Sequence, residues 1–265
     1  MQYVFAQWPK LKRKLQSKQV CIFLDYDGTL TPITKTPQQA ILSKEMKRTL
    51  KILAQNPHCI LIVISGRALS NLKKMIRLKN IIYIGSHGLE FGDLHTAFSI
   101  PISLKYKTIL KQIKNKLSDK LANIKGILIE DKKFSLCLHY RSVNKKNILI
   151  TKNIFKQVVA TYKAQQKLRV LTGKKILEII PDTFWNKGKF VSLILDLLQT
   201  IFKLDHIIPL YIGDDITDEY AFSALKNRGI TIFVGKPKQT QAKYYLKNPV
   251  EVKALLKKIV IVTQT

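Results

Sequence analysis

Two aspartates, Asp25 and Asp27, lie two positions apart directly after the short apolar run Val20–Leu24. In an extended chain, side chains two positions apart point the same way, so both carboxylates would face one ligand. Paired carboxylates bind hard cations and can divide nucleophilic attack from proton transfer. Gly28 permits a tight turn after them, and an ordinary turn sequence is the alternative interpretation of this segment.

A second acidic cluster follows the apolar run Ile208–Ile212. It holds four of the chain's 17 acidic residues within six positions, namely Asp214, Asp215, Asp218 and Glu219. Asp218 and Glu219 would be favourable in the first turn of a helix because of the helix dipole. Asp214 and Asp215 have no such explanation, and we predict that this cluster helps to hold Mg²⁺.

Groups suited to a phosphate follow two other segments. Ser65, Gly66 and Arg67 come directly after the apolar run Ile60–Ile64, at the expected entrance of a helix, where unpaired N–H groups favour an anion. Serine is also a common helix cap, so the triplet alone is weak evidence. Lys187 precedes another expected helix, but it is one of 39 lysines. The four segments together, rather than any single one, predict a phosphate site with a divalent cation.

The order of apolar and amphipathic segments predicts an α/β protein. Alternating strands and helices at both ends of the chain are typical of a parallel sheet with crossover helices, whose ligands bind at the carboxyl ends of the strands. The predicted strands are residues 20–24, 60–64, 81–84, 208–212 and 231–234, and the predicted helices are a segment capped by Ser43 and closed by Pro57, then 68–76, 188–198 and 218–227.

The middle of the chain has a different pattern, which predicts a small α+β insert. Its predicted order is helix 104–121, strands 127–130 and 135–140, helix 148–164, and strands 169–171 and 175–180. We therefore expect a Rossmann-like catalytic core formed by residues 1–96 and 185–265, and an insert of residues 97–184.

Composition fits a folded protein of one or two domains, with 46% apolar and 24% charged residues in 265 positions. The unusual quantity is the formal net charge of +29, which is typical of a nucleic-acid binder, of a protein on an anionic membrane, or of a solvated lysine surface. Only seven of the 46 basic residues are Arg, and the lysines are spread over the whole chain. Phosphate and base contacts favour Arg, so we expect a solvated surface and no nucleic-acid partner.

No apolar run approaches the roughly 20 residues of a membrane span, and Ile259–Val262 has only the length of a strand. Residues 1–18 also lack the apolar core of a signal peptide. We expect a cytoplasmic protein with no membrane partner. Cys21, Cys59 and Cys137 are expected to be reduced, buried thiols rather than disulfide partners or metal ligands.

The combined segments resemble the four motifs of the haloacid dehalogenase superfamily of phosphatases that use an aspartate nucleophile. Within that superfamily, longer strings resemble the trehalose-6-phosphate phosphatase family. The strings are residues 23–33, 63–67, 85–90, 130–141, 177–181, 185–188 and 213–219. The resemblance implies a haloacid dehalogenase-like hydrolase core, with residues 97–184 as an α/β cap that determines substrate specificity.

The resemblance further implies a phosphoric monoester hydrolase that converts trehalose 6-phosphate to trehalose and phosphate, the last step of trehalose biosynthesis. Asp25 would be the nucleophile that forms an aspartyl phosphate, and Asp27 would protonate the departing sugar oxygen and then activate water. Ser65 and Lys187 would bind the phosphoryl oxygens. The implied ligands of Mg²⁺ are Asp25, the backbone carbonyl of Asp27, and Asp214, with Asp218 in support.

The same family match assigns substrate contacts. Glu130, Lys132 and Glu178 would hydrogen-bond the sugar hydroxyls, and their alternative interpretation is a set of salt bridges. Gly66, Arg67 and Arg141 complete the predicted substrate contacts, and the roles of His87 and Asp215 stay open. Two positions depart from the family pattern: Lys133 replaces a small turn residue, and the stretch 183–185 is bulky.

The expected partners are a small sugar phosphate and, in the pathway, a trehalose-6-phosphate synthase. Three alternative functions remain. A related capped phosphatase would act on sucrose phosphate or a glycosyl phosphoglycerate. A phospho-receiver module would explain neither Asp27 nor the insert. A basic nucleic-acid-binding protein would explain the charge, but no motif of that kind is present.

Overall fold

The computed structural model describes residues 1–163, 168–182, 185–200, 203, 206–237 and 239–264. The chain divides into a core unit, Met1–Ser99 with Trp185–Thr265, and an inserted unit, Ile100–Phe184. The division predicted from the sequence assigned residues 97–99 to the insert instead. Each unit has its own sheet, and the core unit has two buried apolar clusters where the inserted unit has one.

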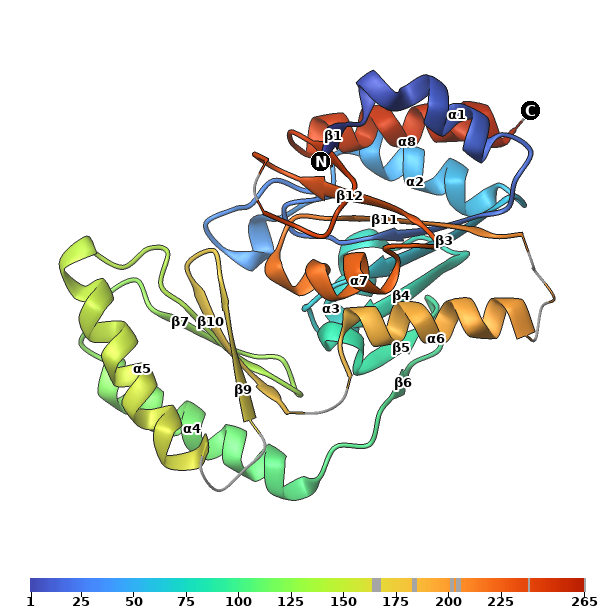
Figure 1. Ribbon diagram of the computed structural model, residues 1–265. Coiled ribbons are helices and arrows are strands. Elements are labelled where there is room, and N and C mark those ends of the chain that lie inside the picture. The colour runs from blue at the N-terminus through green and yellow to red at the C-terminus, as the bar shows by residue number, and fades with distance from the viewer. Residues whose placement is uncertain (164–167, 183–184, 201–202, 204–205, 238, 265) are drawn as a thin grey trace. The chain divides into compact units, whose positions relative to one another are not determined.

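The core unit is built on a nine-stranded sheet with the order β1-β13-β12-β11-β2-β3-β4-β5-β6 (Figure 1). Seven of these strands are parallel: β1 (Gln2–Tyr3), β13 (Tyr244–Leu246), β12 (Ile230–Val234), β11 (Ile208–Gly213), β2 (Val20–Leu24), β3 (Cys59–Ile64) and β4 (Ile81–Gly85). The strands β5 (Glu90–Gly92) and β6 (Phe98–Ser99) are antiparallel to their neighbours. The predicted parallel sheet is therefore extended by strands too short to be predicted.

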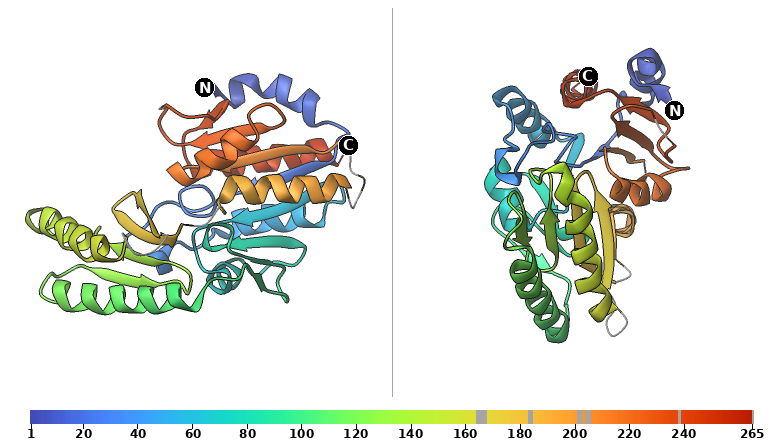
Figure 2. Two further views of the ribbon diagram at one scale, coloured as in Figure 1. Left: turned by 60° about the horizontal axis from the view of Figure 1, so that its bottom comes forward. Right: turned by 90° about the vertical axis from the view of Figure 1, so that its left-hand side faces the viewer.

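Helices cover both faces of this sheet (Figures 1 and 2). One face packs against α1 (Trp8–Leu15), α2 (Lys44–Gln55), α3 (Leu69–Ile76) and α8 (Pro249–Thr263), and the other against α6 (Lys187–Thr200) and α7 (Glu219–Ala224). In β2, Ile22 belongs to the first apolar cluster and Phe23 to the second. A strand buried on both faces needs a continuous apolar run, which is why this segment has no polar residue.

Two local expectations are corrected. The run Ile259–Val262 lies inside α8, because apolar residues at helical spacing continue from Val252 through Leu256 to the end of the chain's last helix. The expected helix 218–227 begins as a 3-10 turn at Ile216–Asp218 and ends at Ala224.

No described helix is both long enough and apolar enough to span a bilayer.

The inserted unit follows the predicted order of two αββ repeats. Its elements are α4 (Leu104–Leu121), β7 (Leu128–Asp131), β8 (Leu136–His139), α5 (Ile148–Lys163), β9 (Leu168–Gly173) and β10 (Ile176–Pro181). The four strands form an antiparallel sheet in the order β7-β8-β10-β9. Ile113 and Leu117 of α4 pack with Leu138 of β8 and Ile179 of β10 in its core.

Short 3-10 turns lie in both units. Besides the turn at Ile216–Asp218, those of the core unit are Phe5–Gln7, Pro37–Gln39 and Ser86–Gly88, and one of the inserted unit is Lys145–Asn147.

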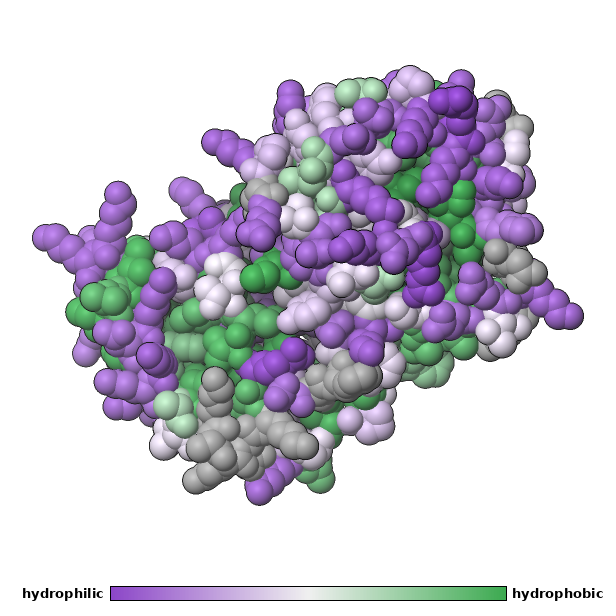
Figure 3. Space-filling view, viewed as in Figure 1, coloured by the Kyte–Doolittle hydropathy of each residue, from purple (hydrophilic) through white to green (hydrophobic). Residues whose placement is uncertain are grey.

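Hydrophilic side chains are spread over both units on the face seen in Figure 3, as expected for lysines distributed along the chain. Among the lysines whose exposure the structure describes, only Lys132 and Lys187 are buried. Burying an ammonium is costly unless it is paired with acceptors. Both exceptions therefore mark places where carboxylates must lie close by.

Candidate active site

Lys187, the first residue of α6, joins two of the predicted site aspartates. Its Nζ donates hydrogen bonds of 2.7 Å to Oδ1 of Asp25 and of 2.7 Å to Oδ1 of Asp218. Burial alone would lower the pKa of Lys187, but attraction to Asp218 and Asp25 outweighs it and raises that pKa well above its ordinary value. The ammonium is therefore a fixed positive charge beside Asp25.

Asp25 lies in a group of three buried carboxylates. Oxygens of Asp25, Asp214 and Asp218 all lie within 4.8 Å of one another. Burial raises the pKa of Asp25 well above its ordinary value, Lys187 opposes this shift, and repulsion from Asp218 and Asp214 adds to it. Hard cations such as Mg²⁺ prefer oxygen ligands, and a cation would offset this repulsion. The donor set therefore fits the predicted metal.

The loop after β2 packs closely against Asp214. The Asp25 N–H donates to the carbonyl of Ile212 at 2.9 Å, which ties the loop to β11. Gly28 has a φ of +88°, and a Cβ at this position would lie 2.2 Å from Oδ2 of Asp214. Both the left-handed backbone and the absence of a side chain are required at Gly28. The segment is therefore a tight turn, as its sequence allows, and the same turn places Asp25 close to Asp214.

Asp218 is held by four donors. Its Oδ1 accepts from Lys187 and from the hydroxyl of Tyr211, at 2.7 Å each. Its Oδ2 accepts from the backbone N–H groups of Asp214 at 3.0 Å and Asp215 at 2.9 Å. This network orients Lys187 and shapes the loop that carries Asp214.

Tyr211 is a site residue that the sequence analysis missed. Its ring is fully buried, and burial together with the charge of Asp218 raises the pKa of its hydroxyl well above the ordinary value. The available signal was a single hydroxyl in an otherwise apolar strand, four positions before Asp215.

The carboxylate of Asp215 accepts from the N–H of Ile216 at 2.8 Å and so caps the 3-10 turn, outside the three-carboxylate group.

Ser65 and Gly66 lie in a tight turn after β3. The Ser65 hydroxyl is buried and accepts from the N–H of Arg67 at 3.2 Å, and a hydroxyl that accepts still has a proton to donate. The His87 ring covers Gly66, where an added Cβ would lie 2.5 Å from its Cε1. Ser86 and His87 have φ values of 50° and 58°, two consecutive left-handed residues that bring the ring there.

Glu90 is a second residue that the sequence analysis missed. It is buried, and its Oε2 accepts from the Ser86 hydroxyl at 2.8 Å and from the N–H of Leu69 at 3.1 Å. The Leu69 N–H belongs to the first turn of α3, so Glu90 caps that helix. Ser65, considered above as a cap, lies outside α3, four residues before it begins.

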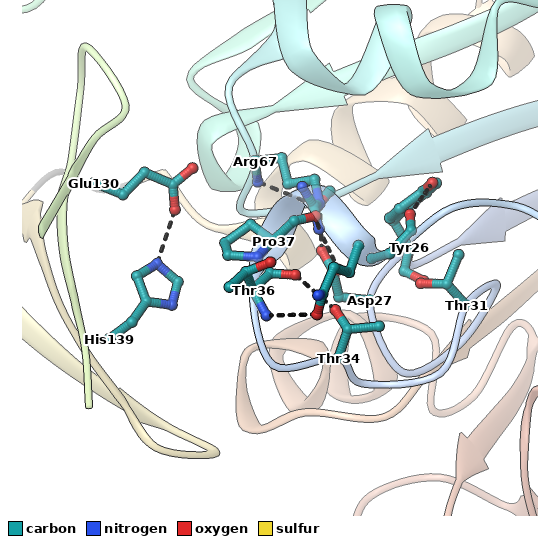
Figure 4. Close-up of polar contacts among 12 residues, drawn as sticks. Tyr26, Asp27, Thr31, Thr34, Thr36, Pro37, Arg67, Glu130 and His139 are labelled. Carbon is teal, nitrogen blue, oxygen red and sulfur yellow. Dashed lines mark hydrogen bonds and ion pairs between the residues drawn. The ribbon is translucent and has the colours of Figure 1, made fainter. Parts of the chain in front are cut away.

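Arg67 binds Asp27 directly (Figure 4). Its Nε donates to Oδ2 and its Nη2 to Oδ1, both at 2.6 Å, and Nη2 also donates to the carbonyl of Pro37 at 2.8 Å. The guanidinium lies over the Tyr26 ring, 5.3 Å from its centroid. The Arg67 side chain is 5% exposed, whereas that of Asp27 is 42% exposed. Asp27, the predicted acid/base residue, is therefore partly open to solvent and bound to a buried arginine.

The predicted sugar contacts lie on one sheet of the inserted unit. Glu178 of β10 accepts at Oε1 from Lys132 Nζ at 3.1 Å and from the Ser135 hydroxyl at 2.7 Å. Burial lowers the pKa of Lys132, but the charge of Glu178 outweighs it and the pKa is raised. Glu130 Oε2 lies 2.9 Å from His139 Nε2 (Figure 4). Lys132 and Glu178 thus form one polar pair, and Glu130 forms a second with His139, a residue that the sequence analysis did not predict.

Two other positions of the inserted unit have structural roles. The Arg141 guanidinium donates to the backbone carbonyl of Lys174, in the turn between β9 and β10. Lys133 has a φ of 71°, a conformation that favours the small turn residue it replaces, and its N–H donates to Oδ1 of Asp131 at 3.1 Å. The first two residues of the bulky stretch 183–185 lie outside the described residues.

A parallel α/β core with acidic loops at the strand ends and an inserted α+β unit defines the haloacid dehalogenase-like phosphatases, in agreement with the solved structures that this chain resembles. The chain belongs to the trehalose-phosphatase family, whose family model matches residues 23–250. As a member of that family it is a phosphoric monoester hydrolase. The predicted fold class, family and enzyme class are confirmed.

Individual relatives agree with this assignment. The chain is 34% identical to the probable trehalose-phosphate phosphatase 3 of Oryza sativa subsp. japonica, over 92% of this chain and 70% of that protein. It is also 34% identical to the trehalose-phosphate phosphatase B of Arabidopsis thaliana, over 92% of this chain and 67% of that one. The C-terminal domain of a Candida albicans trehalose-6-phosphate phosphatase superimposes with a TM-score of 0.81 at 28% identity, over 95% of this chain and 96% of that one.

Proposed function

We propose that this chain hydrolyses trehalose 6-phosphate to trehalose and phosphate, in a Mg²⁺-dependent reaction with Asp25 as the nucleophile. The observation that carries the chemistry is the buried Asp25, held by Lys187 at 2.7 Å and grouped with Asp214. The substrate is supported by the names of the relatives, which are trehalose-phosphate phosphatases. A trehalose-6-phosphate synthase would supply the substrate, so the reaction would be the last step of trehalose biosynthesis.

In the first step, an Asp25 oxygen attacks phosphorus and the bond between phosphorus and the sugar oxygen breaks. Asp27 donates a proton to the departing sugar oxygen. In the second step, Asp27 removes a proton from water, which attacks the aspartyl phosphate and restores Asp25. Two displacements with a covalent intermediate replace one slow displacement. Lys187 and Ser65 would donate hydrogen bonds to the phosphoryl oxygens, where a preorganised donor is worth about 10²- to 10³-fold in rate.

The proposed Mg²⁺ ligands are the carboxylates of Asp25 and Asp214 and the backbone carbonyl of Asp27. When bound, the ion would supply positive charge that offsets the negative charge of the acidic residues and of the phosphoryl group. Asp218 would support the site without being a main ligand of the ion. Both of its oxygens already accept hydrogen bonds from Lys187, Tyr211 and two backbone amides, so its role would be to hold these groups in place.

Asp27 needs its carboxyl at the sugar oxygen, and in this structure Arg67 holds that carboxyl in two short hydrogen bonds. We propose that Arg67 holds and orients Asp27 until the substrate arrives, and that at least one of these bonds opens for proton transfer. This role differs from the direct substrate contact predicted for Arg67. The backbone at Gly66, covered by His87, would remain a contact for the phosphate.

For the sugar, we propose that Glu130, Lys132 and Glu178 hydrogen-bond its hydroxyls. Carboxylates fixed on strands discriminate between sugars, because a hydroxyl in the wrong place leaves a buried acceptor unpaired. Arg141 would support this surface through its bond to the Lys174 carbonyl rather than by touching substrate.

Phosphate release from a panel of esters tests the proposal: trehalose 6-phosphate, sucrose 6-phosphate, a glycosyl phosphoglycerate and glucose 6-phosphate, each with and without Mg²⁺. We expect Mg²⁺-dependent hydrolysis with a preference for trehalose 6-phosphate. Asp25→Asn should lower the rate of this hydrolysis by about 10⁴-fold or more. Asp196→Asn is the matched control, because Asp196 is an exposed aspartate of the same unit. Better turnover of another ester would refute the substrate, and full activity of Asp25→Asn would refute the nucleophile.

A further inference from the structure

Three different metal-binding side chains meet on the sheet of the inserted unit. Glu130 of β7 is paired in register with Cys137 of β8, and His139 lies two positions further along the same strand. One ligand atom from each of the three, a carboxylate oxygen, Sγ and a ring nitrogen, lies within 4.8 Å of the others. Because residues two apart on a strand share a face, the backbone itself places Cys137 and His139 together.

The chemistry of this trio differs from that of the three aspartates in the core unit. Thiolate, imidazole and carboxylate together suit Zn²⁺ and similar transition metals, whereas Mg²⁺ prefers oxygen ligands only. Three protein ligands and one open position form a four-coordinate site that can also take water. The two clusters should therefore select different ions.

We propose that Glu130, Cys137 and His139 bind a transition-metal ion of the Zn²⁺ class. Glu130 Oε2 and His139 Nε2 lie 2.9 Å apart in this structure (Figure 4), so two of the ligands are already close together. When both atoms bind the ion, this hydrogen bond breaks and the proton of the neutral ring is on Nδ1. Binding replaces the S–H bond of Cys137 with a bond from sulfur to the metal and releases one proton to solvent. Cys137 thus has a role beyond that of the buried thiol expected from the sequence.

The neighbours of the trio are consistent with a cation at this place. Glu178 of β10 is paired in register with Cys137 on its other side, so a second carboxylate lies beside the thiol. The ammonium of Lys132 is bound to Glu178 Oε1 at 3.1 Å. Its positive charge is thereby offset by a neighbouring carboxylate, which reduces its repulsion of an incoming ion.

Occupation of this site would affect catalysis through Glu130, a consequence that rests on the proposed function. The ion would take the carboxylate that is proposed to accept a hydrogen bond from the sugar. Zn²⁺ would then compete with the substrate, while the aspartates of the core unit remained available for Mg²⁺.

Binding is tested with Co²⁺, which gives an absorption band from thiolate to metal when sulfur is a ligand. The protein is titrated with Co²⁺ in excess Mg²⁺, so that the all-oxygen cluster is occupied, and Zn²⁺ is then added to displace the probe. We expect the band in the unchanged protein and its loss in Cys137→Ala. In His139→Gln, affinity should fall by more than about 100-fold, since even an outer partner of a ligand is worth about 10- to 100-fold.

Cys59→Ala is the matched control, because Cys59 is a buried thiol of the core unit. This variant should keep the band at full strength. Far-ultraviolet circular dichroism of each variant confirms its fold. The proposal is overturned if the unchanged protein shows no thiolate band, or if the band survives in Cys137→Ala.

The effect on catalysis is measured separately. With trehalose 6-phosphate as substrate, Zn²⁺ should raise the apparent KM of the unchanged protein, and the inhibition constant should weaken by at least about tenfold in Cys137→Ala. Equal inhibition of both proteins would overturn the link to sugar binding. An unchanged protein that shows the band but hydrolyses no trehalose 6-phosphate would refute the proposed function and leave the metal site established.

Discussion

Tyr211 donates a 2.7 Å hydrogen bond to Oδ1 of Asp218, the oxygen that also accepts from Lys187. The hydroxyl thus lies three hydrogen bonds from the predicted nucleophile, because Lys187 also donates to Asp25. Within the described structure, the Tyr211 hydroxyl forms no hydrogen bond with Asp25, Ser65 or Lys187. We therefore expect Tyr211 to be a positioning residue that holds the Asp218 carboxylate in the orientation that Lys187 requires.

Tyr211→Phe should lower kcat by about ten- to 100-fold with little change in KM. Loss of a buried hydrogen bond to a charged acceptor costs about 1.5–3 kcal/mol, and about 1.4 kcal/mol of barrier is tenfold in rate. Steady-state kinetics with trehalose 6-phosphate measure the split. Tyr83→Phe is the control, because the Tyr83 hydroxyl is also buried and donates to the Leu78 carbonyl at 2.7 Å. The same loss of kcat in both variants would contradict a positioning role.

Removal of divalent ions should abolish activity, and Mg²⁺ should restore it. Mg²⁺ should also raise the unfolding temperature, because the ion offsets the repulsion between buried carboxylates; at about 100 times its Kd a ligand stabilises the folded state by about 2.7 kcal/mol. Thermal unfolding with and without Mg²⁺ measures this shift. Asp214→Asn should remove most of it, and the exposed Asp131→Asn should keep it. A full shift in Asp214→Asn would refute that ligand.

Arg67→Lys should reduce kcat/KM by about tenfold or more. A lysine ammonium is a point charge and cannot reproduce the two parallel bonds of the guanidinium to Asp27. Stability should also fall, because the Arg67 side chain is only 5% exposed and a lysine cannot keep the bond to the Pro37 carbonyl together with both bonds to Asp27. Kinetics and thermal unfolding are measured together, with the exposed Arg48→Lys as control. Unchanged kinetics would show that the orientation of Asp27 does not depend on the guanidinium.

Gly28→Ala should destabilise the protein by more than about 1 kcal/mol and impair Mg²⁺ binding. The new Cβ would lie 2.2 Å from Oδ2 of Asp214 and would adopt a φ of +88°. Gly88→Ala separates these two causes: Gly88 also has a positive φ, +105°, but its Cβ would lie 3.5 Å or more from other atoms. Chemical denaturation gives the free energies of unfolding. An equal loss in both variants would assign the whole effect to backbone strain.

Much of the fold was predictable because its signals are local. The apolar run Val20–Leu24 has the length and composition of a strand buried on both faces, and α4 occupies the predicted residues 104–121. The short strands β1 and β6 at the two edges of the sheet, and their neighbours β13 and β5, were not predicted, because two or three residues carry no periodic pattern. Their formation depends on pairing with other strands, which for β1 and β13 lie far apart in the sequence, as Gln2 and Tyr244 do.

Local sequence patterns are sufficient to predict which chemical groups the core unit carries at its strand ends. Parallel strands bring their carboxyl ends to one edge, so the grouping of Asp25, Ser65 and Asp214 follows from their positions along the chain. The partner of each group depends on the three-dimensional fold. Arg67 binds Asp27, 40 positions away, and Lys187 binds Asp25, 162 positions away. Such choices depend on distances of a few ångströms between separate elements, and residue type and spacing along the chain do not encode them.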